Sequence, residues 1–525
     1  MSLIPLRIEL TPSWQEINDD IFNVFSDSDN VDFYFRLYDS KEFEILVDQS
    51  GVVVIDDTYN GKGLLIDQNY NIASFTLNKD YKYYARATEG VNVTVNVRPK
   101  SNVTTNALTG DELYNSGLQA PFNRIRVVQA QKLFDNQLQY DGQPVFWDEK
   151  IVGNAFSTLD PFNSAIDLTV VDDGDLYLRQ LKEYVRYQSG NGQVIKMTFT
   201  PDVNSDEIEF ILRTTSGAFD GSTKGVPFDL VIPRSEWNYD KLDGNGPSRI
   251  NLNLDKSQIF LPDLEWLSTG TVRLGFDIAG KFRACHFIHN ANEIRGAYMT
   301  TANLPASHLI KRVGNKIIQE IGYGDSKNGV LLRYIANNQT TGTLKQICTA
   351  IESEGGLEEE AGYPFSGGAG ATSITLTPGA SFIAVAQHQL LFNGIENRAK
   401  YIPQQANIAT TDSPVFVEFI YNPTVADGAF VPVVGDIFDS IMERNVTATS
   451  LVGGNVIFED TILASSGQGS GQASNAGSNK TTLVSKLPFG IGIDADTPIP
   501  FAVRITNIGS VDTDMYYNFN WKEIR

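Results

Sequence analysis

The sequence predicts an all-β protein, with a small N-terminal β-sandwich followed by a large, jelly-roll-like β-sandwich region. Three observations predict this fold class. Short runs of alternating apolar and polar residues recur along the whole chain, and clusters of Gly, Asn and Asp separate them. Helical periodicity is almost absent, with one weak candidate at 342–354. Aromatic residues make up 11% of the chain and there are 44 glycines, as in sheet proteins with many turns.

Residues 1–100 carry six or seven strand candidates punctuated by turn sequences such as DSDN and NGKG. So many short strands in about 100 residues predict a small β-sandwich. The candidates are LRIEL, VDFYFRLYD, FEILVD, GVVVIDD, ASFTLN, YKYYARATE and VNVTVNVRP. The following segment, 101–121, is polar and holds a possible helix-capping box at 109–112, so we expect a linker there that proteases cut early.

Residues 122–525 continue the β pattern, with more than ten strand candidates and almost no helical signal. This region predicts one large sandwich or two fused sandwiches of jelly-roll type. Within it, TVRLGFDIAGKFRACHFIH at 271–289 contains the turn signal IAGK between two apolar arms. The low-complexity stretch at 465–479 predicts a mobile, exposed loop.

Residues 178–201 predict a β-hairpin around the turn Ser-Gly-Asn-Gly at 189–192. Only one register separates apolar from polar faces, and it places Val185 opposite Ile195. The other face then carries Lys182, Tyr184 and Arg186, which are candidate surface-contact residues. We interpret this basic-aromatic face as the solvated outside of a sheet, with a contact surface as the alternative.

The charge and the apolar pattern exclude several partners. Forty-one basic and 63 acidic residues give a net charge of −22, which repels nucleic acid and anionic lipid. No apolar run is long enough to span a membrane, and the first residues lack the pattern of a signal peptide. The two cysteines, Cys285 and Cys348, form no disulfide or zinc pattern and are expected as buried thiols of a protein folded in a reducing cytoplasm.

The sequence offers weak candidates for chemistry. His286 and His289 are three residues apart, so on a strand they point to opposite faces, and Cys285 also alternates with His286. The acidic run DDGD at 172–175 lacks the ligand spacing of a calcium loop and predicts a hairpin turn. The nucleophile-elbow, Walker and dinucleotide-binding motifs do not occur. We therefore expect no catalytic residues, no cofactor and no metal.

A series of short phrases in a fixed order resembles a family of virion structural proteins of tailed bacteriophages, which includes tail-fibre-like, head-fibre and appendage proteins. The phrases are QPVFW, RLGFDIAGKFRACHFIHNAN, YMTTANLP, ICTAIESEGG, YNP, ATSLVGGNVI and FNWKEI. They are spread over residues 122–525, about three-quarters of the chain. The chain departs from the family at Ser189 and Asn191 and at Ala306-Ser307-His308, so the resemblance carries over no contact made there.

The resemblance implies a non-enzymatic structural protein of the virion, assembled in the host cytoplasm: a head or tail fibre, an appendage or a capsid decoration protein. The alternatives are a host-glycan receptor-binding protein of the tail and a glycan-degrading enzyme, which would need two carboxylates in a cleft. We expect a homotrimer built mainly through 122–525, with 1–100 as the candidate virion-attachment domain. Its partners would be capsid, portal or tail proteins and, in the receptor-binding alternative, host surface glycan, with no nucleic acid and no membrane.

Overall fold

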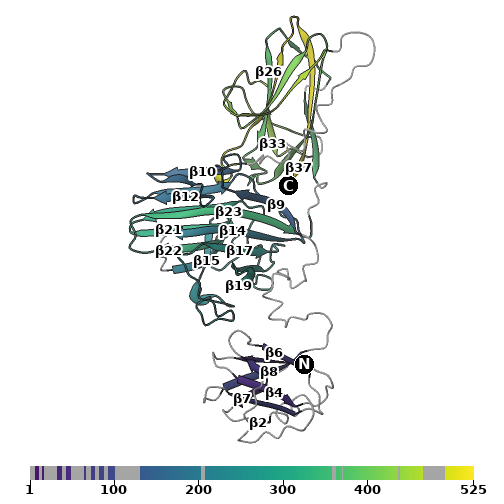
Figure 1. The fold of residues 1–525 in the computed structure, drawn as a ribbon. Helices are drawn as coiled ribbons and strands as arrows, with labels where there is room; N and C mark the ends of the chain where they lie inside the picture. Colours follow the sequence, from purple (N-terminus) through teal and green to yellow (C-terminus); the bar gives the residue numbers. More distant parts are fainter. Residues whose placement is uncertain are drawn as a thin grey trace. The chain divides into compact units, whose positions relative to one another are not determined.

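The computed structural model describes the backbone of the strands within residues 1–100, and residues 130–202, 207–356, 362–368, 371–435, 438–464 and 491–525. The chain divides into two compact units, 1–113 and 114–525. Strands dominate both, and the helical elements among the described residues are two 3-10 turns, η1 (Arg234–Glu236) and η2 (Ile493–Ala495). The structure thus confirms the all-β fold class (Figure 1). No described helix has the length and apolar character needed to cross a membrane.

The first unit contains two four-stranded antiparallel sheets, as expected for a small β-sandwich, here called the N-terminal sandwich. In sheet order, one consists of β1 (Leu6–Leu10), β8 (Val93–Lys100), β3 (Asp32–Leu37) and β6 (Ile72–Thr76). The other consists of β2 (Gln15–Glu16), β7 (Lys82–Ala87), β4 (Phe43–Asp48) and β5 (Leu64–Ile66). The strand predicted at 51–57 and the linker predicted at 101–121 lie outside the described residues.

The second unit begins with the central sandwich, which packs a seven-stranded sheet on an eight-stranded sheet around one apolar core. The seven-stranded sheet runs β10 (Trp147–Val152), β13 (Leu176–Leu181), β20 (Ala306–Val313), β21 (Lys316–Gly324), β22 (Gly329–Ala336), β15 (Glu207–Thr214) and β16 (Phe228–Pro233). The eight-stranded sheet runs β11 (Phe156–Asp160), β12 (Ala165–Val170), β23 (Gly342–Glu354), β14 (Gly192–Asp202), β17 (Gln258–Leu264), β18 (Val272–Ile278) and β19 (Lys281–Ile288), with β9 (Gln131–Gln137) beside β23.

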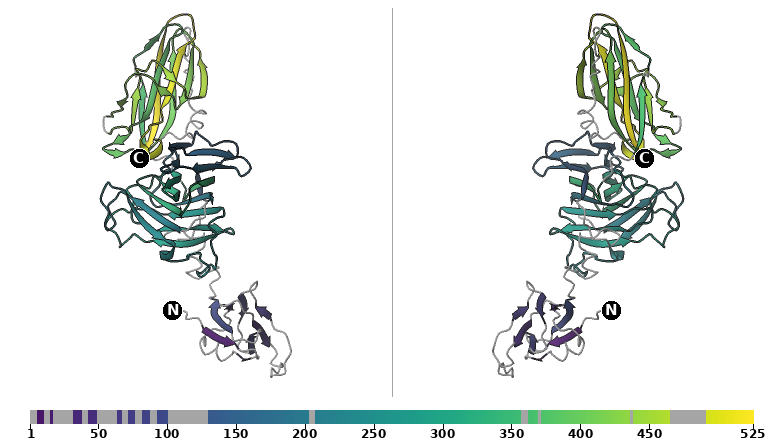
Figure 2. Two further views of the ribbon diagram at one scale, coloured as in Figure 1. Left: turned by 90° about the vertical axis from the view of Figure 1, so that its left-hand side faces the viewer. Right: turned by 90° about the vertical axis from the view of Figure 1, so that its right-hand side faces the viewer.

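The remaining residues form the C-terminal sandwich, drawn in green and yellow in Figure 2, with its own apolar core. One sheet contains β24 (Tyr363–Gly368), β37 (Thr513–Ile524), β25 (Ile374–Leu376) and β29 (Lys400–Thr410). The other contains β32 (Val431–Pro432), β33 (Met442–Asn445), β26 (Ser381–His388), β36 (Phe501–Asn507), β30 (Val415–Tyr421) and β35 (Asn455–Ile462). Two small pairs complete it: β27 (Leu391–Phe392) with β28 (Ile395–Glu396), and β31 (Thr424–Val425) with β34 (Leu451–Val452). The predicted loop at 465–479 lies outside the described residues.

The predicted hairpin at 178–201 is wrong. Its first arm, β13, pairs with β10 and β20 in one sheet, whereas its second arm, β14, pairs with β23 and β17 in the other. Val185 bridges to Leu304, and Ile195 lies opposite Ile351. The apolar residues of the two arms do face each other, but across the core from opposite sheets, so the segment between them is a crossover between sheets. The DDGD turn likewise joins β12 to β13 in different sheets and is not a hairpin turn.

The weak helix candidate at 342–354 is also wrong, because those residues form β23, a long strand near the middle of its sheet. Buried and half-buried residues alternate along it with the period of two that a strand requires. By contrast, the hairpin predicted around IAGK is confirmed: β18 and β19 pair antiparallel across Ala279 and Gly280. Both turn residues have positive φ, 55° and 71°, as a tight two-residue hairpin turn requires.

Candidate functional site

The three residues predicted to share an exposed face do not do so. Lys182 is half-buried, and its Nζ donates a hydrogen bond to the carbonyl oxygen of Pro144 (2.7 Å). Tyr184 is buried, 5% exposed, and packs against residues of the C-terminal sandwich. Arg186 is half-buried, and its carbonyl accepts a hydrogen bond from Gln193. The expected basic-aromatic surface is therefore wrong, because this segment crosses between sheets instead of lying on the outside of one.

The weak metal candidates have structural roles. The Asp175 carboxylate accepts hydrogen bonds from the backbone N–H groups of Asn154, Val171 and Asp172 at 2.8–3.0 Å, which fixes the turn between sheets. Asp173 is exposed and accepts a hydrogen bond from the backbone N–H of Gly314 (2.5 Å).

The two histidines of the 285–289 segment have different partners. Nδ1 of His286 accepts a hydrogen bond from the backbone N–H of Asn238 (3.1 Å), and burial lowers the pKa of this imidazole to about 4. His289 lies 3.2 Å from the hydroxyl of Thr271. Across the ranges that the structure describes, no three His, Cys, Asp or Glu side chains are grouped as a metal site would require.

A set of polar contacts joins the central and C-terminal sandwiches of the second unit. We call this set the sandwich junction. Its contacts link turns and strand ends, and each contact joins a residue of the central sandwich to a residue of the C-terminal sandwich. They include Asp325 with Arg398, Lys327 with Glu396, Glu183 with Lys400, Lys150 with Asp494, the backbone N–H of Ser326 with Asp494, and Asp148 with the backbone N–H of Ile493.

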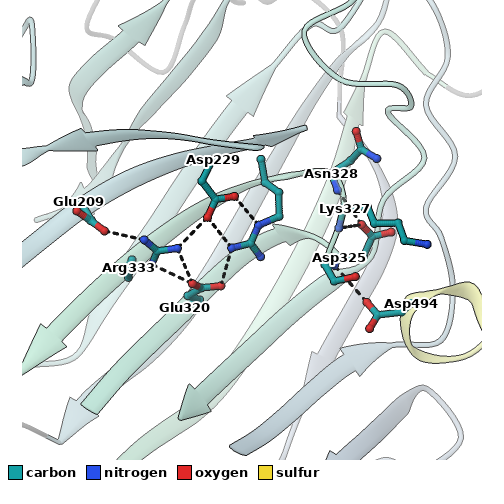
Figure 3. Close-up of polar contacts among 10 residues, drawn as sticks. Glu209, Asp229, Glu320, Asp325, Lys327, Asn328, Arg333 and Asp494 are labelled. Carbon is teal, nitrogen blue, oxygen red and sulfur yellow. Dashed lines mark hydrogen bonds and ion pairs between the residues drawn. The ribbon is translucent and has the colours of Figure 1, made fainter. Parts of the chain in front are cut away.

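Asp325 is the best-buried charge of the sandwich junction, with a side chain that is 0% exposed (Figure 3). Oδ1 of its carboxylate accepts hydrogen bonds from the backbone N–H groups of Lys327 and Asn328, both at 2.8 Å, within the turn from β21 to β22. Oδ2 accepts a hydrogen bond from Nη2 of Arg398 at 2.5 Å. Because a buried carboxylate is stable only with its partners in place, this pair fixes the position of one sandwich on the other.

Arg398 connects the sandwich junction to Tyr184, since its guanidinium lies 5.5 Å from the centre of that ring. The same guanidinium also lies 3.0 Å from Glu396, and its side chain is only 9% exposed. Sequence reasoning missed these residues because charged residues in the turn segments 323–329 and 395–400 are typical of solvated loops. The sequence contains no signal that pairs two turns about 70 residues apart.

A second acid–base network covers the outer face of the seven-stranded sheet (Figure 3). Arg213 contacts Asp229 (2.8 Å) and Glu320 (3.3 Å), and Arg333 contacts Glu209 (2.9 Å), Asp229 and Glu320. Burial raises the pKa of Asp229, but hydrogen bonds and charge from the two arginines outweigh it, so this pKa lies below its ordinary value. The network therefore keeps Asp229 ionised between the two arginines.

The C-terminal sandwich contains a small apolar cavity of about 50 Å³. It lies between the two sheets, where Ala384, Ala386 and Ala406 leave room beside Phe519 and Trp521. Its lining is mostly apolar, and Glu443 in its wall is engaged by Gln387 (2.6 Å). The cavity can take apolar groups but lacks the converging polar groups that orient a specific ligand.

No family model matches the chain, and no curated protein matches it significantly. Solved structures similar to part of it are β-sandwich lectins. The exoplasmic/lumenal domain of VIP36 in its Ca²⁺/Man3GlcNAc-bound form has 9% identity and a TM-score of 0.22, with 44% of this chain and 92% of that chain covered. Lectin UEA-II complexed with galactose has 8% identity and a TM-score of 0.18, with 43% and 100% covered. The Bauhinia forficata lectin in complex with GalNAc has 14% identity and a TM-score of 0.15, with 43% and 98% covered. Likenesses at these TM-scores assign no ligand to this chain.

Proposed function

We propose that this chain is a non-enzymatic structural protein of a tailed-bacteriophage virion: a head or tail fibre, an appendage or a capsid decoration protein. The observation that carries the proposal is the sandwich junction. Tandem domains in one chain usually move relative to each other unless their interface is extensive. Here a set of polar contacts, one of them through the buried side chain of Asp325, joins the two sandwiches. A fibre or appendage needs such a fixed link, because it has to hold its parts at a set distance and angle.

The charged groups of the central sandwich support a non-enzymatic role. A glycan-degrading enzyme needs one carboxyl group that stays protonated near a second, ionised one. Among the carboxylates grouped on the seven-stranded sheet, Asp229 lies instead between two arginines, which hold its pKa below the ordinary value. The ordered phrases between QPVFW and FNWKEI support the virion setting, because they lie in both sandwiches of the second unit.

In this proposal residues 1–100 attach the protein to capsid, portal or tail proteins, and the second unit forms a homo-oligomer, in the simplest case a homotrimer. The protein is made in the host cytoplasm and remains on the particle. Recognition of host surface glycan would be a further function of the second unit, and a glycan-binding experiment would detect it.

Labelling of purified virions tests the proposal. Antibodies raised against residues 130–525 should mark one fixed position on head or tail in electron micrographs, and mass spectrometry should find the chain in virions after extensive washing. A version without residues 1–100 should fold but no longer join particles. Absence of the chain from washed virions would refute the virion role, while selective binding to host glycans on an array would favour the receptor-binding alternative.

A further inference from the structure

One positively charged side chain of the C-terminal sandwich lies among four aromatic rings. The central carbon of the Arg525 guanidinium, Cζ, lies 4.6 Å from the ring centre of Tyr363 and 4.7 Å from that of Phe392. It lies 5.6 Å from the ring centre of Phe365 and 5.9 Å from that of Phe438. A cation within about 6 Å of a ring centre is attracted by the electron-rich face of the ring. We call these four rings the aromatic cage.

The number of rings around one guanidinium sets this place apart from other cation–ring contacts. Arg179, Arg273 and Arg398 each lie over a single ring among the described residues. A single contact of this kind arises wherever the stem of an arginine packs beside an aromatic side chain. Several rings around one cation are instead the arrangement with which proteins recognise cationic ligands.

The aromatic cage is assembled from three segments that are distant in sequence. Tyr363 and Phe365 lie on β24, Phe392 lies on β27, and Phe438 lies between β32 and β33. The Phe438 ring packs edge-on against Tyr363 (5.2 Å between ring centres) and Phe365 (5.3 Å), and Phe365 stacks on the buried Trp521 (5.8 Å). None of these three contacts involves the guanidinium, so they can hold the rings in place when that group is removed.

A buried carboxylate completes the site. Oε2 of Glu523, whose side chain is 0% exposed, lies 2.8 Å from Nη2 of Arg525 and 3.3 Å from its Nε. The carbonyl oxygen of Asp439 also accepts a hydrogen bond from Nη2. Glu523 is itself held by the backbone N–H of Ile441 (3.1 Å) and by Nε1 of Trp521 (2.9 Å). Ring faces for a flat cation, with a fixed carboxylate at its edge, are the groups that a guanidinium requires.

We propose that the aromatic cage and Glu523 form a binding site for a monosubstituted guanidinium group, and that Arg525 fills this site as a ligand from the same chain. The inference is independent of the virion role. An ammonium group would fit less well, because it is a strongly hydrated point charge without a flat face to lie against the rings. As the resident ligand, Arg525 ties β24, β27 and the segment before β33 to the end of β37.

Chemical rescue of the full chain tests the proposal. Arg525→Ala empties the site and should lower the melting temperature by roughly 5 °C. Ethylguanidinium at millimolar concentration should restore most of this loss, because a ligand that binds only the folded state raises its stability with the logarithm of ligand concentration. In the wild type the site is filled, so ethylguanidinium should not raise the melting temperature. Saturation-transfer NMR should detect bound ethylguanidinium with Arg525→Ala and not with the wild type.

Arg504→Ala is the matched control. Arg504 pairs with Glu418 in the same sandwich through two contacts of 2.5 Å, and among the described residues no aromatic ring lies over its guanidinium. Ethylguanidinium should therefore not rescue this variant. Adding Phe392→Leu to Arg525→Ala keeps an apolar side chain but removes one ring face, so rescue should need a several-fold higher concentration. Ethylammonium, which has the charge without the flat face, should rescue less than ethylguanidinium.

Three outcomes would overturn the inference. If ethylguanidinium raises the melting temperature of Arg525→Ala no more than that of Arg504→Ala, or if rescue is undiminished by Phe392→Leu, the rings around Arg525 do not form a binding site. If ethylammonium rescues equally well, the site selects charge and not a guanidinium. Should Arg525→Ala fail to fold on its own, its refolding yield with each compound provides the same comparison.

Discussion

Replacing Arg398 with methionine is the most direct test of the sandwich junction. The substitution removes the charge that faces Asp325, whose side chain is 0% exposed and whose Oδ2 lies 2.5 Å from Nη2 of Arg398. Methionine keeps most of the length and apolar volume of the arginine stem, so little packing is lost. The change therefore removes the charge partner of Asp325, together with the contacts of the same guanidinium with Glu396 and the Tyr184 ring.

The magnitude follows from the burial of the carboxylate that remains. Removing one partner of a buried ion pair costs about 3–5 kcal/mol. Asp325 keeps its two hydrogen bonds from the backbone N–H groups of Lys327 and Asn328, so we expect the lower end, about 3 kcal/mol. The cost is confined to the sandwich junction. The two sandwiches should unfold in one transition in the wild type and in two transitions in the Arg398→Met variant.

Differential scanning calorimetry of the full chain measures this. The control Lys132→Met breaks an exposed pair with Asp135, where both side chains are more than half exposed, and should cost less than about 1 kcal/mol. Asp325→Asn combined with Arg398→Met should recover part of the lost stability, because no unpaired charge is then buried. If Arg398→Met unfolds in the wild-type pattern and at the temperature of the control, the ion pair does not hold the sandwiches together and the reasoning is refuted.

Three further outcomes are expected. Burial lowers the pKa of His308 to about 3 and that of His388 to about 4, so both contribute stability that is complete above the unfolded pKa of about 6.5 and is lost toward the folded values. Between about pH 6 and 5, the free energy of unfolding in urea should fall by roughly 1.4 kcal/mol per pH unit for each of these two histidines. A double His308→Gln/His388→Gln variant should lose their share of the slope and keep the smaller share of the half-buried His286. Gly275→Ala places a Cβ 2.1 Å from a carbonyl oxygen of β19 and should lower the free energy of chemical unfolding by about 3 kcal/mol. Gly174→Ala, where only the positive φ is strained, should lower it by about 1 kcal/mol. Equal losses in the two variants would contradict the steric account. Cys285 is 0% exposed and burial raises the pKa of its thiol, so a thiol reagent should modify it only after unfolding, and rapid labelling of the native chain would show that the core opens there.

Local pattern in the sequence predicted most of the strands and one tight hairpin turn, at Ala279 and Gly280. The alternation of apolar and polar residues has the period of a strand, and this period depends only on backbone geometry. The turn at Ala279 and Gly280 could be predicted because Gly280, which tolerates positive φ, lies in a two-residue gap between two apolar arms. The same pattern correctly gave an all-β chain and also predicted the mostly apolar character of the inner faces.

Tertiary structure alone decided which strands pair and which charges meet. β13 and β14 both have apolar inner faces separated by a turn signal, and this pattern fits a hairpin as well as two strands on opposite sheets. The choice depends on contacts distant in sequence, such as β20 beside β13 and β23 beside β14. In the same way, Asp325 and Arg398 each lie in a turn that is typically solvated, and only the packing of two sandwiches brings them together. Periodicity determines which side of a strand faces a core, whereas the free energy of long-range packing determines what covers that side.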